Sequence, residues 1–370
     1  MNGKITARQA ICTLYLYELG SSLVTGSSEK AGQDSWIAVI IGLAFAIPMI
    51  ALYSKLSEIE PEMDFFEMCE AAFGKIGGRI ATFLFSAYAL LLGALVVRDF
   101  TEYLQVLSLP ETPQPVIAVC MGLLGWYGIR KGISVPARNA SFIAPLGTLV
   151  IFVLFALSVK LMNFDNLKPF LEHDTKTLLQ AGYTSFVFPF AESALFLAIF
   201  CDADSSVSRK KLYLWGIIPA GTILTMLVVG NTAVLGDFLA KSMYFPSYES
   251  ISVVDLGKFL SRFEVLVSGN FMIFGLLKSM ICLYVASRGF VHLTGWQCKW
   301  LLISAAVSAG TVALSQTIYD STMQMVSALK YYYRYAPLVE VVLPLLVFLT
   351  LSAKKALSRR RQAPTPEENA

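Results

Sequence analysis

Three ionisable side chains stand in the middle of long apolar segments, where a charge is unexpected: Glu18, Glu192 and Lys278. An ionised group inside a bilayer is costly, and such residues mostly mark a binding site or path for a ligand or ion. Either acid could carry a proton. The Lys278 ammonium could occupy the space of a coupling cation, which would make sodium unnecessary. The alternative, which the sequence leaves open, is a structural ion pair between Lys278 and one of the two acids.

Both acids lie beside residues that interrupt a helix. Gly20 follows Glu18 closely, and Pro189, which lacks a backbone N–H group, precedes Glu192. Irregular backbone at membrane depth is tolerated only where it is buried in protein or lines a cavity. One such break is explained by a simple kink, but two at corresponding positions predict a ligand site. The candidate ligand-binding residues are Gly20, Ser21, Ser22, Phe188, Pro189 and Glu192, and the candidate proton or cation-surrogate residues are Lys278 and Glu18.

The two breaks also indicate the chemistry of the ligand. The N-terminus of a half-helix attracts a carboxylate. Backbone carbonyls that a break frees can accept hydrogen bonds from an ammonium group. A zwitterionic amino acid satisfies both, so an amino acid is the expected ligand class.

Other chemistries find little support in the sequence. The six cysteines are scattered without a CxxC pair, and the two histidines, His173 and His292, are far apart. We therefore expect no disulfide, no metal and no cofactor. There is no P-loop and no nucleophile–base constellation, so we predict that the chain is not an enzyme and does not itself use ATP.

The segments that carry these residues have the composition of membrane spans. The chain has 370 residues, of which 56% are hydrophobic and only 15% are charged, whereas soluble domains are about 25% charged. We predict an all-α integral membrane protein with about ten transmembrane helices, because a helix of roughly 20 apolar residues crosses a bilayer. The predicted spans are residues 6–26, 34–57, 79–107, 114–130, 138–161, 179–201, 212–235, 264–287, 299–316 and 335–353.

The breaks fall in the first span of each half of the chain. Because each half has an odd number of spans, the second half enters the membrane from the opposite side, which predicts a five-plus-five inverted repeat with broken helices 1 and 6. The predicted domains are residues 1–161 (spans 1–5), residues 162–353 (spans 6–10, with outer loops 162–178 and 236–263) and a basic tail, 354–370, predicted to be disordered. Most Lys and Arg residues fall in loops on the side of the two termini, which predicts that both termini are cytoplasmic.

Several short strings, in order along the chain, resemble the spore-germination permease family. They are the AGQDSW string at Ala31–Trp36, Glu111-Thr112-Pro113, the stretch from Gly128 to Ile133 that leads to Ala137-Arg138, Pro189-Phe190 with Glu192, Arg262 with Glu264, and Lys278. The resemblance covers nearly the whole chain. One departure is Phe271, where relatives often have Trp, and this difference bears on pocket shape and ligand size.

This resemblance implies the fold of the amino acid–polyamine–organocation transporter superfamily and the role of the B subunit of an endospore germinant receptor. It implies a small-molecule ligand, often an amino acid, near the midplane, and as partners a membrane-anchored A subunit and a lipoprotein C subunit, with no nucleic acid. The location would be the bacterial cytoplasmic membrane, which is the inner membrane of the spore. Two alternatives stay open: a proton-coupled secondary amino-acid transporter, with Glu18 or Glu192 as proton carrier, and a structural scaffold with a vestigial pocket.

Overall fold

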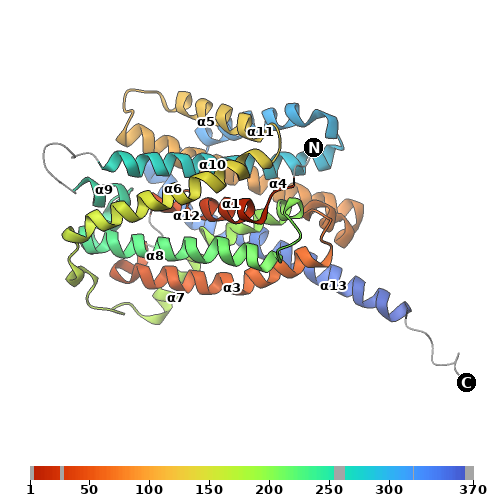
Figure 1. Cartoon of the computed structure of the whole chain (residues 1–370), viewed down its shortest axis with the longest axis horizontal. Helices are drawn as coiled ribbons and strands as arrows, with labels where there is room; N and C mark the ends of the chain where they lie inside the picture. Colours follow the sequence, from red (N-terminus) through yellow and green to blue (C-terminus); the bar gives the residue numbers. More distant parts are fainter. Residues whose placement is uncertain (1–3, 26–28, 254–262, 320, 363–370) are drawn as a thin grey trace, which may run out of the picture.

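Helices make up almost all of the computed structural model, which describes residues 4–25, 29–253, 263–319 and 321–362 (Figure 1). Within these ranges the β-structure is confined to an isolated bridge between Ile5 and Ala203. The prediction of an all-α chain is confirmed.

The described ranges contain seven helices that are long and apolar enough to cross a membrane, and a shorter apolar helix, α5 (Gln114–Ile129). The remaining two predicted spans are helices broken in the middle, so the structure accounts for all the predicted crossings. The first is α1 (Ala7–Leu19) with α2 (Ser22–Thr25), and the second is α7 (Thr175–Val187) with the 3-10 helix η4 (Phe190–Ala198). The long helices are α3 (Ser35–Ile59), α4 (Phe65–Leu107), α6 (Ser134–Ser158), α8 (Arg209–Ser242), α10 (Glu264–Thr294), α11 (Trp300–Thr317), and α12 (Thr322–Pro337) joined to α13 (Leu343–Gln362) by the π-helix η7 (Leu338–Val342).

Two glycines turn the chain within α4 and α8, close to predicted span boundaries. Gly74 has a φ of 73° and separates a short first segment of α4 from the crossing itself, which was predicted to start at residue 79. Gly236 has a φ of 78° and follows the predicted end of its span at residue 235. Glycine adopts such positive φ values without the steric cost that other residues meet.

The two broken helices lie in the middle of the bundle. Helix α1 contacts α6, α8, α10 and η4, and η4 also contacts α3, α4 and η7. The other helices pack around this centre: α3 runs alongside α7 and α8, α4 packs on α10, and α5 packs on α11 (Figure 1). The interrupted backbone is therefore enclosed by protein, as an irregular segment at membrane depth requires.

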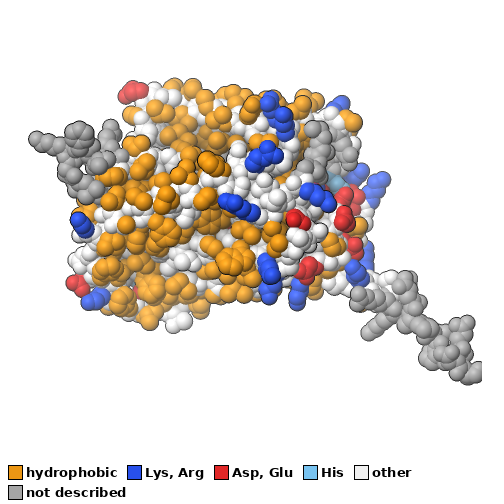
Figure 2. Space-filling view, in the orientation of Figure 1, with side chains coloured by type: hydrophobic (Ala, Val, Ile, Leu, Met, Phe, Trp, Pro, Cys, Tyr) orange, Lys and Arg blue, Asp and Glu red, His pale blue; other side chains and the backbone are white. Residues whose placement is uncertain are grey.

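The sides of the bundle are apolar, as a bilayer demands of a protein that crosses it. Large hydrophobic side chains such as Leu123, Phe142 and Leu149 are more than half exposed. Figure 2 shows hydrophobic side chains over the middle of the molecule, while Lys, Arg, Asp and Glu gather mainly at the end where the chain terminates. Apolar sides between polar ends identify an integral membrane protein.

The last helix runs further than predicted. The sequence predicts a disordered tail from residue 354, but α13 continues to Gln362, and residues 363–370 lie outside the described part. Two lysines anchor this extension to the bundle: Nζ of Lys354 donates to the backbone oxygen of Ala71 (2.7 Å), and Nζ of Lys355 donates to that of Ile59 (2.8 Å). These contacts depend on the fold, so the composition of the tail did not reveal them.

Candidate functional site

The first break lies between α1 and α2, at Gly20. The backbone leaves the helical conformation there (φ −21°, ψ −103°), and α2 begins at Ser22. A Cβ atom added to Gly20 would lie 2.6 Å from Cδ and 3.1 Å from Cβ of Lys278, so only glycine leaves room for this lysine. The predicted interruption of the first span is confirmed, and the break packs directly against α10.

The second break separates α7 from η4, at Phe188 and Pro189. Phe188 is extended (φ −128°, ψ 115°), and its N–H donates to the backbone oxygen of Thr184 at 3.0 Å. Pro189 then offers no N–H group to continue the helix. Glu192 follows on η4, and its N–H donates to the Pro189 oxygen at 3.1 Å. The second predicted interruption is confirmed, and it carries Glu192 into the centre of the bundle.

Glu192 and Lys278 meet between the two breaks. Nζ of Lys278 lies 2.6 Å from Oε2 of Glu192, and both side chains are 0% exposed. The contact is an ion pair at close range, although its angles are not those of a hydrogen bond. The ammonium also lies over the rings of Tyr17 (4.9 Å to the centroid) and Phe188 (5.0 Å), which attract a cation electrostatically. Of the two acids that the sequence offered as partners for Lys278, the structure pairs it with Glu192.

A network of tyrosines joins Glu192 to a third acid, Glu340 of η7. The Tyr332 hydroxyl donates to Oε1 of Glu192 at 2.5 Å and lies 3.1 Å from the Tyr88 hydroxyl. Tyr88 donates in turn to Oε1 of Glu340, and Tyr53 donates to the backbone oxygen of Glu340 at 2.7 Å. None of these four residues was among the predicted site residues. Through Tyr332 the network holds Oε1 of Glu192, while Lys278 lies at Oε2.

Several buried polar atoms beside the ion pair have no hydrogen-bond partner among the described residues. They include both carboxyl oxygens of Glu18 and the hydroxyls of Ser22 and Tyr213. Native proteins rarely leave such groups unpaired, and a cluster of them calls for water, an ion or a ligand at that place. This cluster lies at the predicted site.

The third span also reaches the first break. Asp99 of α4 interacts with the side chain of Ser21 and lies within electrostatic reach of Lys278. Asp99 was not among the predicted site residues, although it is an acid within an apolar span, as Glu18 is. Phe271 of α10, the position that departs from the family pattern, is fully buried and stacks on Phe100 of α4 at 4.1 Å between ring centroids.

The predicted site residues are thus brought together. Glu18, Gly20, Ser21 and Ser22 come from the first break, Phe188, Pro189 and Glu192 come from the second, and Lys278 comes from α10. The charged members, Glu18, Glu192 and Lys278, are all 0% exposed, so the site is closed to solvent. In the described part of the chain, no group of His, Cys, Asp or Glu side chains is placed to hold a metal ion.

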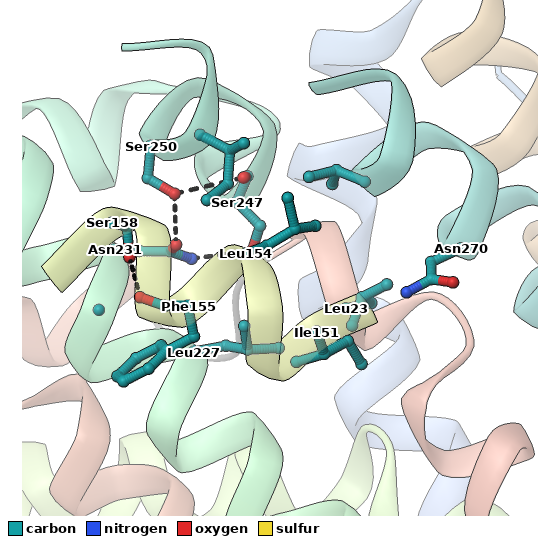
Figure 3. A pocket seen from close by; sticks show the side chains of 13 residues that line it. Leu23, Ile151, Leu154, Phe155, Ser158, Leu227, Asn231, Ser247, Ser250 and Asn270 are labelled. Carbon is teal, nitrogen blue, oxygen red and sulfur yellow. Dashed lines mark hydrogen bonds between the residues drawn. The ribbon is translucent and has the colours of Figure 1, made fainter. Parts of the chain in front are cut away.

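A small cavity lies next to the site, beside Leu23 of α2 (Figure 3). It measures about 40 Å³, enough for a few water molecules. Its polar groups bond mainly to one another: Nδ2 of Asn231 donates to the Ser247 hydroxyl, and the Ser250 hydroxyl donates to Oδ1 of Asn231, both at 2.8 Å. These bonds attach the short helix α9 (Pro246–Ser252) to α8.

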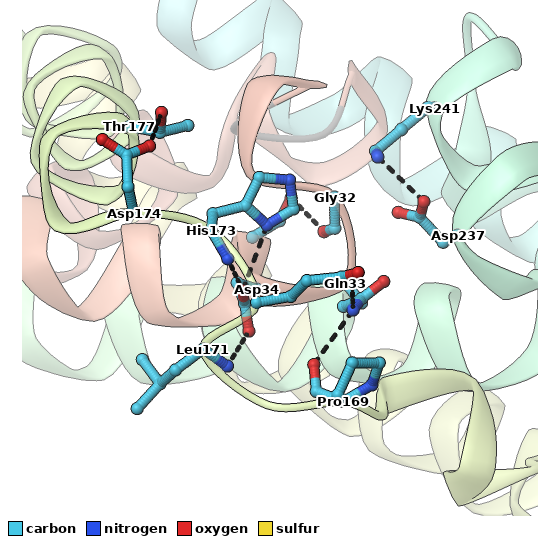
Figure 4. Close-up of polar contacts among 12 residues, drawn as sticks. Gly32, Gln33, Asp34, Pro169, Leu171, His173, Asp174, Thr177, Asp237 and Lys241 are labelled. Atoms are coloured by element: carbon cyan, nitrogen blue, oxygen red, sulfur yellow. Dashed lines mark hydrogen bonds and ion pairs between the residues drawn. The ribbon is translucent and has the colours of Figure 1, made fainter.

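One end of the bundle is closed by the AGQDSW string (Figure 4). Asp34 is buried, and its Oδ1 accepts a hydrogen bond from the backbone N–H of Leu171 (2.8 Å), while Oδ2 lies 3.2 Å from Nδ1 of His173. Gln33 donates from Nε2 to the backbone oxygen of Pro169 at 2.9 Å. The string therefore holds the loop 162–174. The sequence predicts an outer loop over 162–178, of which residues 175–178 already belong to α7.

The opposite end, beside the N-terminus, is closed by Arg288 of α10. Its Nε donates to Oδ2 of Asp64 at 2.9 Å, and its Nη1 donates to Oδ2 of Asp202, which follows η4. The N-terminal segment also contacts Asp202, since the backbone N–H of Ile5 donates to the backbone oxygen of Asp202 at 2.9 Å. Contacts at both ends thus enclose the central ion pair.

A bundle with two crossing helices broken at one buried, charged site has the architecture of secondary transporters. MhsT in complex with L-phenylalanine is similar with a TM-score of 0.67, at 12% identity, covering 92% of this chain and 87% of that one. Mhp1, a nucleobase-cation-symport-1 family transporter, is similar with a TM-score of 0.66, at 14% identity, covering 97% of this chain and 80% of that one. The predicted fold class, with broken helices 1 and 6, is confirmed.

The sequence comparison narrows this class to one family. The chain belongs to the spore germination protein family, whose model matches residues 4–321. Spore germination protein KB of Bacillus subtilis (strain 168) is 29% identical over 289 residues, which cover 77% of this chain and 78% of that protein. The putative spore germination protein YfkT of the same organism is 25% identical over 331 residues, covering 88% and 89%. The resemblance found in the sequence is confirmed.

Proposed function

We propose that this chain is the membrane-embedded, ligand-binding B-type subunit of a spore germinant receptor and that it binds an amino acid or a similar small molecule between the two helix breaks. The observation that supports this most is the fully buried ion pair between Glu192 and Lys278. It lies where both helices are interrupted and where polar atoms lack partners.

The chemistry of the site matches a zwitterion. A ligand carboxylate would meet the Lys278 ammonium, and a ligand ammonium would meet the Glu192 carboxylate. Each residue would then exchange its present partner for an oppositely charged group of the ligand, so neither charge is left buried and unpaired. The space for the ligand would come from movement at the two breaks, since Gly20 now packs closely against Lys278.

Ligand binding would act by shifting an equilibrium between a closed and an open arrangement. A ligand can do this only through a difference in its affinity for the two states. Asp34 at one end and Arg288 at the other supply contacts that would differ between those states. A membrane-anchored A subunit and a C lipoprotein would read the shift, in the inner membrane of the spore, with both termini of this chain in the cytoplasm.

The second candidate function is proton-coupled transport of an amino acid. The observation in its favour is Glu18, a fully buried carboxyl without a hydrogen-bond partner, which is suited to carry a proton. In both functions we propose that the Lys278 ammonium takes the place of a coupling cation. Replacing sodium by choline would then leave binding and flux unchanged, and a strict sodium requirement would exclude this role for Lys278.

The experiment that separates the two functions is equilibrium binding and uptake of radiolabelled amino acids with the same purified chain in proteoliposomes. Binding without flux supports the receptor subunit. Saturable flux that is lost in Glu192→Gln and kept in Glu58→Gln, an exposed glutamate, would identify a transporter. Absence of both binding and flux would contradict both functions and favour a scaffold with a vestigial pocket.

A further inference from the structure

Glu18 differs from Glu192 in its charge environment. The Glu18 side chain is 0% exposed, and neither of its oxygens has a hydrogen-bond partner among the described residues. Glu192, equally buried, has Lys278 at 2.6 Å and the Tyr332 hydroxyl at 2.5 Å. An ionised Glu18 would therefore carry the cost of leaving water without the contacts that compensate Glu192.

The groups around Glu18 come from all sides of α1 and contain more acid than base. Those within electrostatic reach are Lys278 of α10, Glu192 of η4, Glu340 of η7, Tyr17 of α1, Tyr53 of α3 and Tyr213 of α8. Asp99 adds another acid close to Lys278. The single ammonium of Lys278 cannot neutralise all of these acids. Several carboxyl groups in one buried site are not all ionised, because their negative charges repel one another.

We propose that Glu18 is a neutral carboxylic acid in the closed protein and that it recognises the ligand through hydrogen bonds and not through charge. The identity of the ligand rests on the proposed function, whereas the protonation state of Glu18 does not. With Glu18 neutral, the ion pair of Glu192 and Lys278 supplies one anion and one cation to the ligand. A ligand with one ammonium and one carboxylate leaves this balance intact, so the favoured class is zwitterions without net charge.

The protonation state can be tested on the purified chain without any ligand. Infrared spectra of the wild type and of Glu18→Gln are compared at neutral pH in water and in heavy water. The proposal expects a protonated-carboxyl band that shifts in heavy water and is missing from Glu18→Gln, while Glu58→Gln keeps it. A difference spectrum that contains only carboxylate bands would overturn the proposal. Thermal unfolding of each variant verifies that it is folded.

The second arm measures binding of radiolabelled L-amino acids of neutral, positive and negative net charge. Glutamine keeps a hydrogen-bonding group but carries no charge, so Glu18→Gln should weaken binding much less than Glu192→Gln, which we expect to bind at least about tenfold more weakly than the wild type. An equal loss in both variants would show that Glu18 acts as a charge and would overturn the proposal. If no amino acid binds to the wild type, the proposed function fails, and the infrared result alone decides the state of Glu18.

Discussion

Gly20 and Lys278 occupy space that only a residue without a side chain can share, because a Cβ atom on Gly20 would lie 2.6 Å from Cδ of the lysine. The helix break and the charged site therefore depend on each other. Gly20→Ala should force Lys278 away from Glu192 and destabilise the protein by about 1–3 kcal/mol, the usual cost of overpacking.

Thermal unfolding in detergent measures this effect, together with ligand binding. The matched control is Gly269→Ala, since Gly269 is an exposed residue of α10 and an added Cβ there has nothing within 4 Å. An unchanged unfolding temperature in Gly20→Ala would show that Lys278 can move freely and that the two features are independent.

Lys278 should stabilise the protein only as part of a pair. Lys278→Met leaves Glu192 buried without its cation, which we expect to cost about 3–5 kcal/mol, while the double variant Lys278→Met/Glu192→Gln should recover most of that loss. Unfolding of the single and double variants measures the coupling. Lys168→Met is the control, because Lys168 pairs with Asp165 at the surface, where such pairs contribute little. Additive effects of the two substitutions would contradict a direct ion pair.

Arg288 should control access to the site from the end beside the N-terminus. Its Nη2 lies 3.4 Å from Sγ of Cys201, and its other nitrogens hold Asp64 and Asp202. Arg288→Gln should loosen this end and raise the rate at which a maleimide modifies Cys201. Cys282, which is fully buried on α10, should stay unreactive and serves as the internal reference. Equal labelling rates of Cys201 in wild type and variant would show that Arg288 does not close this end.

Asp34 should fix the loop 162–174 to the bundle. Asp34→Asn removes the charge that accepts hydrogen bonds from the Leu171 backbone and the His173 ring, and we expect a loss of about 1–3 kcal/mol. Limited proteolysis of the loop reports this directly, with faster cleavage expected in the variant. Asp165→Asn, in the same loop but exposed, is the control. Cleavage at the same rate in Asp34→Asn and wild type would mean that other contacts hold the loop.

The sequence predicted the crossings and both breaks because these features follow from local composition. An apolar run forms a crossing helix, and Gly20 and Pro189 interrupt the helix at their own positions. The charged residues Glu18, Glu192 and Lys278 could be recognised because their sequence neighbours are mostly apolar. The tyrosine network was not predictable in this way. Tyr88 and Tyr332 are far apart in the sequence and are common residue types in membrane helices, so only the fold shows that they connect Glu192 to Glu340.

The AGQDSW string shows a second reason why the sequence alone did not reveal the role of some residues. Its residues were used as a family signature, and their physical role became visible only when the structure placed Asp34 and Gln33 against a loop that follows much later in the chain. Gly32 is part of the same packing: its φ of 54° and the closeness of Lys241 and Asp237 leave no room for a side chain. The motif alone does not show which loop it contacts, because the loop lies far away in the sequence.

The central claim is that the ligand binds at the Glu192–Lys278 pair, and equilibrium binding to the double variant Lys278→Met/Glu192→Gln tests it most directly. This variant removes both charges without leaving either one unpaired, so loss of binding cannot be attributed to unfolding once its unfolding temperature is shown to be close to that of the wild type. We expect a folded protein that no longer binds the amino acid that the wild type binds. Binding with wild-type affinity would place the ligand elsewhere and contradict the account.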